Sequence, residues 1–182
     1  MLEVIAISGK KGTGKDWYAA KLRDWDPAFT VIVAFADPIK CRLYGQGHED
    51  VLLAEKPIDT RHHLIETGKQ EKKAYGEYFY ARQLLALIRL YASRGTRRVI
   101  ISDLRFQVEL FILEAHRDNG EFSLKLIRME APERNRLRIE REAKGDSERA
   151  ALLAADISEV DLDELSKVPG RFEIIWNDLT AA

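Results

Sequence analysis

The amino-acid sequence predicts a three-layer α/β fold built on a parallel sheet of about five strands. Five short apolar stretches alternate with longer helical stretches along the chain, and no segment is repeated. This alternation is typical of parallel strands that are joined by helical crossovers. In addition, a glycine-rich segment follows the first apolar stretch and an aspartate follows the third, so polar residues stand where strands of such a sheet end.

The expected strands are short runs that are rich in β-branched and other apolar residues, and they lie at 2–8, 30–35, 98–102, 123–129 and 172–176. Continuous apolar runs of this kind suit strands that are buried on both faces. Helical patterns lie between them, at 16–22, within 39–93, at 107–117 and within 132–155. A chain of 182 residues that is 46% hydrophobic can bury one core, so we expect 1–182 to form a single domain.

Composition and charge argue against several classes of protein. No apolar run approaches the length of about 18 residues that a membrane-spanning helix needs, and the N-terminus lacks a signal-peptide pattern. The single cysteine, Cys41, cannot form an internal disulfide, which agrees with a reducing compartment. The net charge of -1 gives little support for nucleic-acid binding. We therefore expect a cytoplasmic protein with neither a membrane nor a nucleic-acid partner.

The glycine-rich segment after the first strand has the pattern of a phosphate-binding loop, GxxxxGK, with Asp in place of the usual Ser or Thr after the lysine. Its glycines let the backbone turn tightly and point N–H groups at phosphate oxygens, while the lysine reaches the outer phosphates. We expect a triphosphate to contact Gly9, Lys10, Lys11, Gly12, Thr13, Gly14, Lys15 and Asp16. The alternative is a turn between a strand and a helix that binds no ligand.

The third strand ends in an acid, Asp103, and an arginine follows two residues later, at Arg105. A carboxylate at this edge of a parallel sheet lies near the phosphate-binding loop and can hold Mg²⁺ directly or through water. The alternative is an aspartate that caps the helix after it. Arg105 favours the first interpretation, because a guanidinium at the same edge can pair with Asp103 or hold a second phosphate.

A basic and aromatic stretch occupies 56–82. Among its cations, Arg61 and Arg82 are the better candidates for an anionic ligand, because a guanidinium binds phosphate with two parallel hydrogen bonds. For Lys69, Lys72 and Lys73, a solvated helix face is the simpler interpretation. The neighbouring aromatic residues could stack on a base or belong to the core, and they are Tyr75, Tyr78, Phe79 and Tyr80. His62 and His63 have no metal-ligand partners at suitable spacing and stay unassigned.

Arginines recur after the fourth strand, at Arg134, Arg138 and Arg141. Their three- and four-residue spacing places them on one helical face, with only a weak apolar stripe from Leu137 and Ile139. A weakly buried helix of this kind can move and deliver positive charge to a reacting phosphate. The alternative is an exposed helix stabilised by Glu–Arg pairs.

Taken together, these motifs resemble a group of P-loop kinases, namely the phage and bacterial deoxynucleoside monophosphate kinases and the animal-type phosphomevalonate kinases. The segment SGKKGTGKD is similar to their SGxxxSGKD loop, and SDLRF at 102–106 is similar to their SDxR motif. Less specific similarities occur at ADPIK (36–40), RHHLIETG (61–68), YFYAR (78–82), Ser158–Glu159 and Asn177. The resemblance implies a P-loop NTPase fold that resembles nucleoside monophosphate kinases, with an acceptor-binding helical region at about 39–93 and a lid at about 132–155.

The resemblance also implies transfer of the γ-phosphoryl group of ATP, with Mg²⁺, to a small molecule that already bears a phosphate. The residues expected to act on the transferring group are Lys15, Asp103, Arg105 and Arg138. The acceptor would contact Lys40, Arg61, Arg82 and Arg105, and Mg²⁺ would lie near Asp16 and Asp103. Arg134 and Arg141 would contact ATP from the lid.

The acceptor itself stays open at this point. The DLRFxxE pattern resembles the first group, whereas the chain length and the nearly ungapped run from ADPIK to SDLR resemble the second. We favour a deoxynucleoside monophosphate, with 5-phosphomevalonate as the alternative, because the short, charge-rich chain also resembles a phage gene product. If a phage encodes the protein, we expect it in the host cytoplasm. Lys72 stands where the family often has an arginine. Two further hypotheses are a kinase of a modified base in DNA and a regulatory module that binds ATP without catalysis. A homodimer is an assembly that we also allow for.

Overall fold

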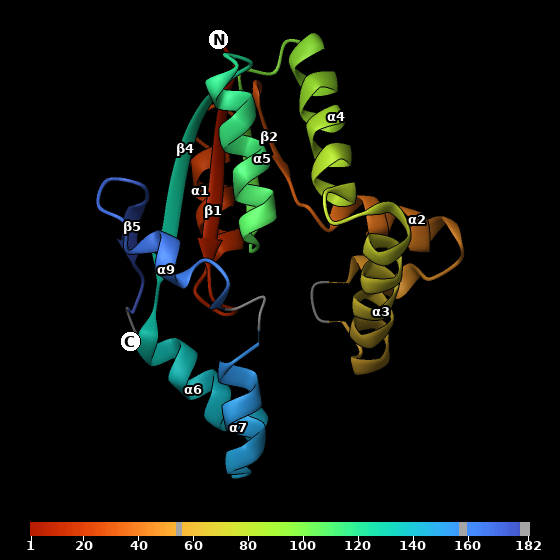
Figure 1. Ribbon diagram of the computed structural model, residues 1–182, viewed down its shortest axis with the longest axis vertical. Helices are drawn as coiled ribbons and strands as arrows, with labels where there is room; N and C mark the ends of the chain where they lie inside the picture. Colours follow the sequence, from red (N-terminus) through yellow and green to blue (C-terminus); the bar gives the residue numbers. More distant parts are fainter. Residues whose placement is uncertain (54–55, 157–159, 179–182) are drawn as a thin grey trace.

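The computed structural model describes residues 1–53, 56–156 and 160–178, and its centre is a five-stranded parallel sheet (Figure 1). The strands are β1 (Glu3–Gly9), β2 (Thr30–Val33), β3 (Arg98–Leu104), β4 (Ser123–Glu130) and β5 (Glu173–Trp176), in the spatial order β2-β3-β1-β4-β5. This order is consistent with a three-layer P-loop NTPase-like fold, so the predicted fold class is confirmed. It also brings the carboxyl ends of β3, β1 and β4 side by side at one edge.

The strands lie close to where their apolar runs predict them, and β3 extends two residues further. Its pairing with β1 shifts, since Ala6 lies opposite Ile101 whereas Ser8 lies opposite Leu104. Two residues of β3, Ser102 and Asp103, therefore stand opposite the single residue Ile7. An irregularity of this type bends a strand and redirects its side chains. The acid that ends the apolar run is thus placed at an irregular point of the sheet edge.

Helices cover both faces of the sheet. On one face, α4 (Phe79–Ser93) and α5 (Gln107–Asp118) pack on a large buried cluster that includes Leu84, Ile101 and Leu113 (Figure 1). On the other face, α1 (Lys15–Arg23) packs on a smaller cluster through Ala19 and Leu22. Because the strands contribute alternate residues to the two clusters, both of their faces are apolar. This burial gives the scaffold that holds the sheet edge in place.

The segment between β2 and β3 forms a separate helical lobe, with α2 (Asp37–Gly45), the short 3₁₀ helix η1 (Glu49–Leu52), α3 (Ile58–Tyr75) and the start of α4. Its own small core consists of Ile39, Leu43, Val51 and Tyr80. A polar contact also joins its helices, because Glu71 of α3 accepts hydrogen bonds from both Arg42 of α2 and Tyr80 of α4. The lobe therefore has internal support, and it lies beside the sheet edge in Figure 1.

A helical hairpin follows β4, formed by α6 (Pro132–Ala143) and α7 (Ser147–Ala154). The sequence predicts one helical segment over 132–155, but the backbone turns at Lys144 (φ 55°) and Gly145 (φ 85°). Asp146 then caps α7, since its side chain accepts from the backbone N–H of Arg149 at 3.0 Å. The hairpin extends away from the sheet beyond the carboxyl end of β4 (Figure 1). A further short helix, α9 (Asp163–Ser166), precedes β5.

No helix within 1–53, 56–156 or 160–178 is both long and apolar enough to cross a membrane. The helix α3 has 18 residues, but its sequence, IDTRHHLIETGKQEKKAY, is rich in charged side chains. Length without an apolar surface does not suffice for a span of the bilayer.

Gly9, the last residue of β1, lies very close to β4 at this edge of the sheet. A Cβ atom on Gly9 would lie 2.5 Å from the carbonyl oxygen of Met129, and its φ of 142° is unfavourable for other residues. Gly120 also has a positive φ, 76°, but a Cβ there would meet no atom within 4 Å. We expect Gly9→Ala to lower the free energy of unfolding by about 1–3 kcal/mol more than Gly120→Ala, because only the first variant adds a steric overlap. Urea unfolding of the two variants measures this, and equal losses would contradict it.

Candidate functional site

The loop between β1 and α1 has the shape that its glycines predict. Gly12 and Gly14 adopt φ of 85° and 91°, which side chains other than glycine rarely tolerate. Thr13 is 1% exposed, and both its backbone N–H and its Oγ1 donate to the carbonyl of Lys10, at 3.3 and 2.9 Å. The loop therefore closes on itself, and α1 begins directly after it. Its N-terminal N–H groups give this end of the helix a partial positive charge.

Lys15 lies inside this loop. Its side chain is buried, and its Nζ donates to the carbonyl oxygens of Gly9 at 2.5 Å and Lys10 at 2.8 Å. These carbonyls hold the ammonium group at the centre of the loop. An ammonium held by neutral oxygens is ready to exchange them for charged phosphate oxygens, which form stronger hydrogen bonds.

A pocket of about 270 Å³ opens beside the loop and brings together residues from three parts of the chain. Its wall consists of the loop and the start of α1, the end of β3 with the residue that follows it, and one residue of α6. The lining residues are Lys11, Gly12, Gly14, Lys15, Asp16, Trp17, Ser102, Asp103, Arg105 and Arg134. The structure thus places both predicted metal carboxylates, Asp16 and Asp103, in one pocket with Lys15.

Asp103 has a second role that the sequence does not predict. One carboxylate oxygen accepts from the backbone N–H of Phe35 at 2.7 Å and the other from that of Ala36 at 3.2 Å. Burial raises the pKa of Asp103, while these two N–H groups and the charges of Arg105 and Lys40 act in the opposite direction. The carboxylate therefore ties the end of β3 to the start of the helical lobe, and Arg105 and Lys40 lie within electrostatic reach of it.

Three cations of the helical lobe gather opposite the loop. The pKa of Lys56 is lowered by burial and then by the positive charges of Lys40 and Arg61, whereas Asp16 acts to raise it. Lys40 is also held by Asp37, with an Nζ to Oδ1 distance of 3.0 Å. These effects place Lys56 near Lys40, near Arg61 and near Asp16. Lys56 was not among the predicted site residues, because it precedes α3 and its approach depends on how that helix packs.

The helix α6 lies directly against the loop. Arg138 is buried, and its Cδ lies 3.6 Å from where a Cβ on Gly12 would be. Arg134 Nη1 lies 3.7 Å from the corresponding position on Gly14. Arg138 also donates to the side chain of Asn135 at 2.9 Å. Arg141, by contrast, is exposed, so the structure brings two of the three predicted lid arginines to the loop.

Other predicted residues lie further from the pocket. Arg82 is exposed on the first turn of α4 and is not among the residues that line the pocket. Lys72 lies over the ring of Phe106, with its Nζ 4.2 Å from the ring centre. Ser158 and Glu159 lie outside the described residues. Arg82 and Arg141 stay predictions as ligand contacts.

The sequence leaves open whether the aromatic residues of the helical lobe stack on a base or belong to the core, and the structure places some of them in the core and leaves others exposed. Tyr80 is buried in the core of the lobe, and Phe79 is partly buried against it. Tyr75 is exposed and stacks on Phe79, with ring centres 4.7 Å apart, and Tyr78 is exposed. Tyr75 and Tyr78 are therefore the members of this group with ring surface accessible to a ligand.

Two polar contacts behind the loop fix its position. Asn177, which follows β5, donates from Nδ2 to the carbonyl of Thr13 at 2.8 Å. On the other side, Lys10 pairs with Asp163 of α9 at 3.5 Å. The position of Asn177 after the last strand is a signal for the first contact, because parallel strands end at one edge. No comparable signal points to Asp163.

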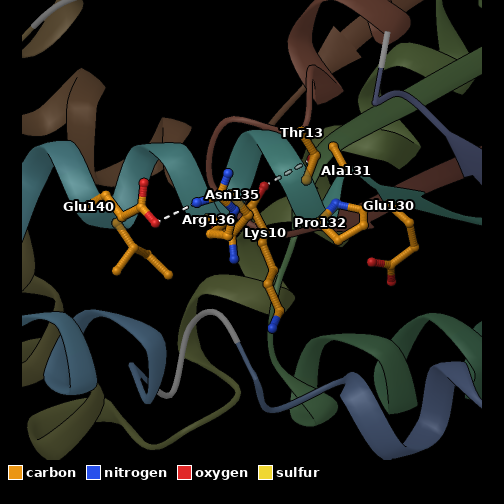
Figure 2. A pocket seen from close by; sticks show the side chains of 9 residues that line it. Lys10, Thr13, Glu130, Ala131, Pro132, Asn135, Arg136 and Glu140 are labelled. Atoms are coloured by element: carbon orange, nitrogen blue, oxygen red, sulfur yellow. Dashed lines mark hydrogen bonds and ion pairs between the residues drawn. The ribbon is translucent and has the colours of Figure 1, made fainter. Parts of the chain in front are cut away.

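A second pocket, of about 410 Å³, lies on the side of α6 that faces Lys10 (Figure 2). Its lining includes Glu130, Pro132, Asn135 and Ile139 besides Lys10. Figure 2 shows Lys10 crossing this space from the loop, with α6 above it. Residues of α6 and of the loop therefore line both pockets, and Arg134 lines only the smaller one.

A metal centre made only of protein ligands is absent from the described part of the chain, where no three His, Cys, Asp or Glu side chains gather suitably. His63 contacts His48, with ring centres 4.9 Å apart. Mg²⁺, however, usually binds through one or two carboxylates, substrate phosphates and water. The pair Asp16 and Asp103 beside a phosphate-binding loop fits that pattern, because both carboxylates line the same pocket.

No model of a known protein family matches the chain, and no curated protein matches it either. Inference of its function therefore depends on the sheet order and on the residues that line the smaller pocket.

Glu109 at the start of α5 supports the turn that bears Asp103 and Arg105. It is 6% exposed, and its Oε2 accepts from the backbone N–H groups of Arg105 at 3.0 Å and Phe106 at 3.1 Å. Burial raises the pKa of Glu109 to about 8, and the negative charge of Asp103 contributes in the same direction. The surroundings of the Glu109 carboxylate thus favour its protonated form over its charged form.

The raised pKa of Glu109 predicts a dependence of stability on pH. The folded state binds the proton more tightly than the unfolded chain, whose pKa is near 4.5, so this stabilisation is complete below pH 4.5 and is lost as the pH rises towards 8. Across this window, the free energy of unfolding should fall by up to about 1.4 kcal/mol per pH unit relative to Glu109→Gln. Urea unfolding at several pH values measures the difference. Glu148→Gln, which changes an exposed glutamate of α7, is the control and should show the same pH dependence as the wild type. Parallel curves for the wild type and Glu109→Gln would contradict the prediction.

Proposed function

We propose that the protein is an ATP-dependent phosphotransferase that moves the γ-phosphoryl group to a small phosphorylated acceptor, most simply a deoxynucleoside monophosphate. One observation supports this above the others. The P-loop with Lys15 and the carboxylates Asp16 and Asp103 lines one pocket, and the basic cluster Lys40, Lys56 and Arg61 lies near it. Two separate cationic regions around one reaction space suit two phosphorylated substrates.

The donor side is the P-loop. Its backbone N–H groups and the start of α1 would hold the β-phosphate of ATP, and the buried Lys15 would neutralise the charge that develops between the β- and γ-phosphates. Arg134 and Arg138 would add positive charge from α6. Because Arg138 is buried against Gly12, it needs only a local adjustment to reach a phosphate on the loop.

Mg²⁺ would be held by Asp16 and Asp103, through its water molecules. When bound, the ion neutralises phosphate charge and aligns the donor for transfer. Both oxygens of Asp103 already accept backbone hydrogen bonds from Phe35 and Ala36, which restrict the carboxylate to one orientation. A carboxylate oriented in advance loses little freedom when a hydrated ion arrives.

The acceptor side would be the cluster of Lys40, Lys56 and Arg61, together with Arg105 at the end of β3. Arg105 lines the pocket, and Lys40 of the helical lobe lies near enough to act, as Arg105 does, on the charge of Asp103. A phosphate monoester with two negative charges would be neutralised there and aimed at the donor phosphate. This arrangement supports an acceptor that already bears a phosphate rather than a neutral alcohol.

A specific observation keeps 5-phosphomevalonate as a second candidate. A nucleobase needs an aromatic surface, and Tyr80 and much of Phe79 are used in the core of the lobe. Tyr75 and Tyr78 have accessible rings for a base, whereas a small mevalonate chain would need neither. The two acceptors therefore differ in their demand on these two tyrosines.

We expect the protein to release ADP from ATP and Mg²⁺ only when a suitable monophosphate is present. The test is a coupled ADP-release assay with each deoxynucleoside monophosphate and with 5-phosphomevalonate, and a reaction without acceptor is the control. Turnover with 5-phosphomevalonate alone would replace the first acceptor by the second. ATP binding without turnover on any acceptor would instead favour a regulatory module or a kinase that acts on DNA.

Lys15→Ala should lose about 3 kcal/mol or more of transition-state stabilisation, because a preorganised charge contact with the transferring group is removed. This corresponds to a decrease of about a hundredfold or more in kcat/KM in the same assay. Lys21→Ala is a matched control, since Lys21 is an exposed lysine on the same helix. Retention of activity by Lys15→Ala would contradict the role of the P-loop in catalysis.

A further inference from the structure

Glu142 on α6 is a carboxylate that contacts two cations and lies within electrostatic reach of a third. Its Oε1 lies 2.8 Å from Nζ of Lys11 in the P-loop, and its Oε2 lies 3.4 Å from Nη1 of Arg138 on α6. Arg61 of α3 is the third cation. Burial acts to raise the pKa of Glu142, but Lys11, Arg138 and Arg61 together lower it. The charged form of Glu142 is therefore stabilised in this place.

These cations are the ones that a phosphate group would need. Lys11 lines the pocket beside the loop, and Arg138 packs on Gly12. Arg61 lies near Lys56 of the helical lobe, and Lys56 in turn lies near Asp16. A carboxylate and a phosphate group present the same chemistry to such cations, because both accept charge-assisted hydrogen bonds through negatively charged oxygens.

Glu142 also links α6 to the loop through its ion pair with Lys11. The contact between Glu142 and Lys11 joins residues that are 131 positions apart, and the side chains are only 26% and 38% exposed. A triphosphate that entered the loop would add three or more negative charges beside this carboxylate. Negative charges in one small site repel each other, so the phosphates and the Glu142 carboxylate would compete for Lys11 and Arg138.

We propose that Glu142 is an internal counter-anion of the phosphate site. Without nucleotide, its carboxylate occupies part of the cation cluster formed by Lys11 and Arg138, and the phosphates of a triphosphate displace it when they bind. This inference rests on the proposed function and deepens it, because it names a residue that weakens nucleotide binding and keeps the lid helix on the loop between turnovers.

The same helix offers a matched control. Glu140 lies two residues before Glu142, but its side chain is 56% exposed and pairs with Arg136, which is exposed too. Both side chains line the larger pocket together with Lys10, and neither lines the pocket that contains Lys15. Glu140→Gln therefore removes the same charge from the same helix without changing the contact with Lys11.

The test is isothermal titration calorimetry with inorganic tripolyphosphate and, separately, with ATP. Tripolyphosphate reports on the cation cluster without a contribution from the base or from catalysis. We expect Glu142→Gln to bind tripolyphosphate about fivefold to tenfold more tightly than the wild type, and Glu140→Gln to remain within about twofold of it. Glu142→Asp, which keeps the charge on a shorter side chain, should fall between the wild type and Glu142→Gln. The gain should shrink at high salt, because screening weakens the competing charges.

The outcomes separate this inference from the proposed function. If the wild type binds tripolyphosphate and Glu142→Gln binds it no more tightly than Glu140→Gln does, Glu142 is not a counter-anion, while the proposed kinase activity stands. If only Glu142→Gln binds, the inference is supported strongly. If no variant binds tripolyphosphate or ATP, although circular dichroism shows that all are folded, both proposals fail.

Discussion

The concentration of positive charge on one short loop is the constraint on which the rest of the site depends. Lys10, Lys11 and Lys15 lie within six positions of one another. Ammonium groups so close together repel each other, and this repulsion has to be offset by contacts with negatively charged or polar acceptors. In the structure, each of the three lysines has different acceptors. Lys10 pairs with Asp163, Lys11 pairs with Glu142, and Lys15 donates to two carbonyl oxygens of the loop. Since Asp163 and Glu142 lie on different helices, α9 and α6 are both attached to the loop by its charge.

This arrangement extends into the core through a buried arginine. Arg128 on β4 is 3% exposed, and it contacts Ser8 on β1, Glu130 on its own strand and Asp163 on α9. A buried guanidinium is tolerated only when its donors have acceptors, and here two of these acceptors are carboxylates. Asp163 serves both Arg128 and Lys10. The loop is therefore connected to the middle of the sheet by a continuous series of ion pairs, in addition to the apolar packing of β1.

The sequence was a good guide wherever function depends on a strand end. Runs of Val and Ile identify the strands, and a parallel sheet necessarily brings Lys15 and Asp103 to one edge. It was a weaker guide wherever function depends on how a helix is turned. The spacing of Arg134, Arg138 and Arg141 predicts a common face. The buried residues of α6 are instead Arg138 and Ala143, and Arg141 is exposed. Lys56 illustrates the same limit, since it approaches the site only through the packing of a whole lobe. No local pattern contains that information.

The hydrogen bonds from Phe35 and Ala36 to Asp103 have a consequence for communication across the pocket. These two residues directly precede α2, on which Lys40 lies, so the start of the helical lobe is joined to the carboxylate that faces the P-loop. A ligand that shifts this backbone must also shift or rotate Asp103, because a hydrogen bond loses most of its strength when its geometry is lost. We therefore expect a ligand in one half of the pocket to affect the other half through the side chain of Asp103. The two proposed substrates would then influence each other's affinity without touching, and by equal factors in both directions.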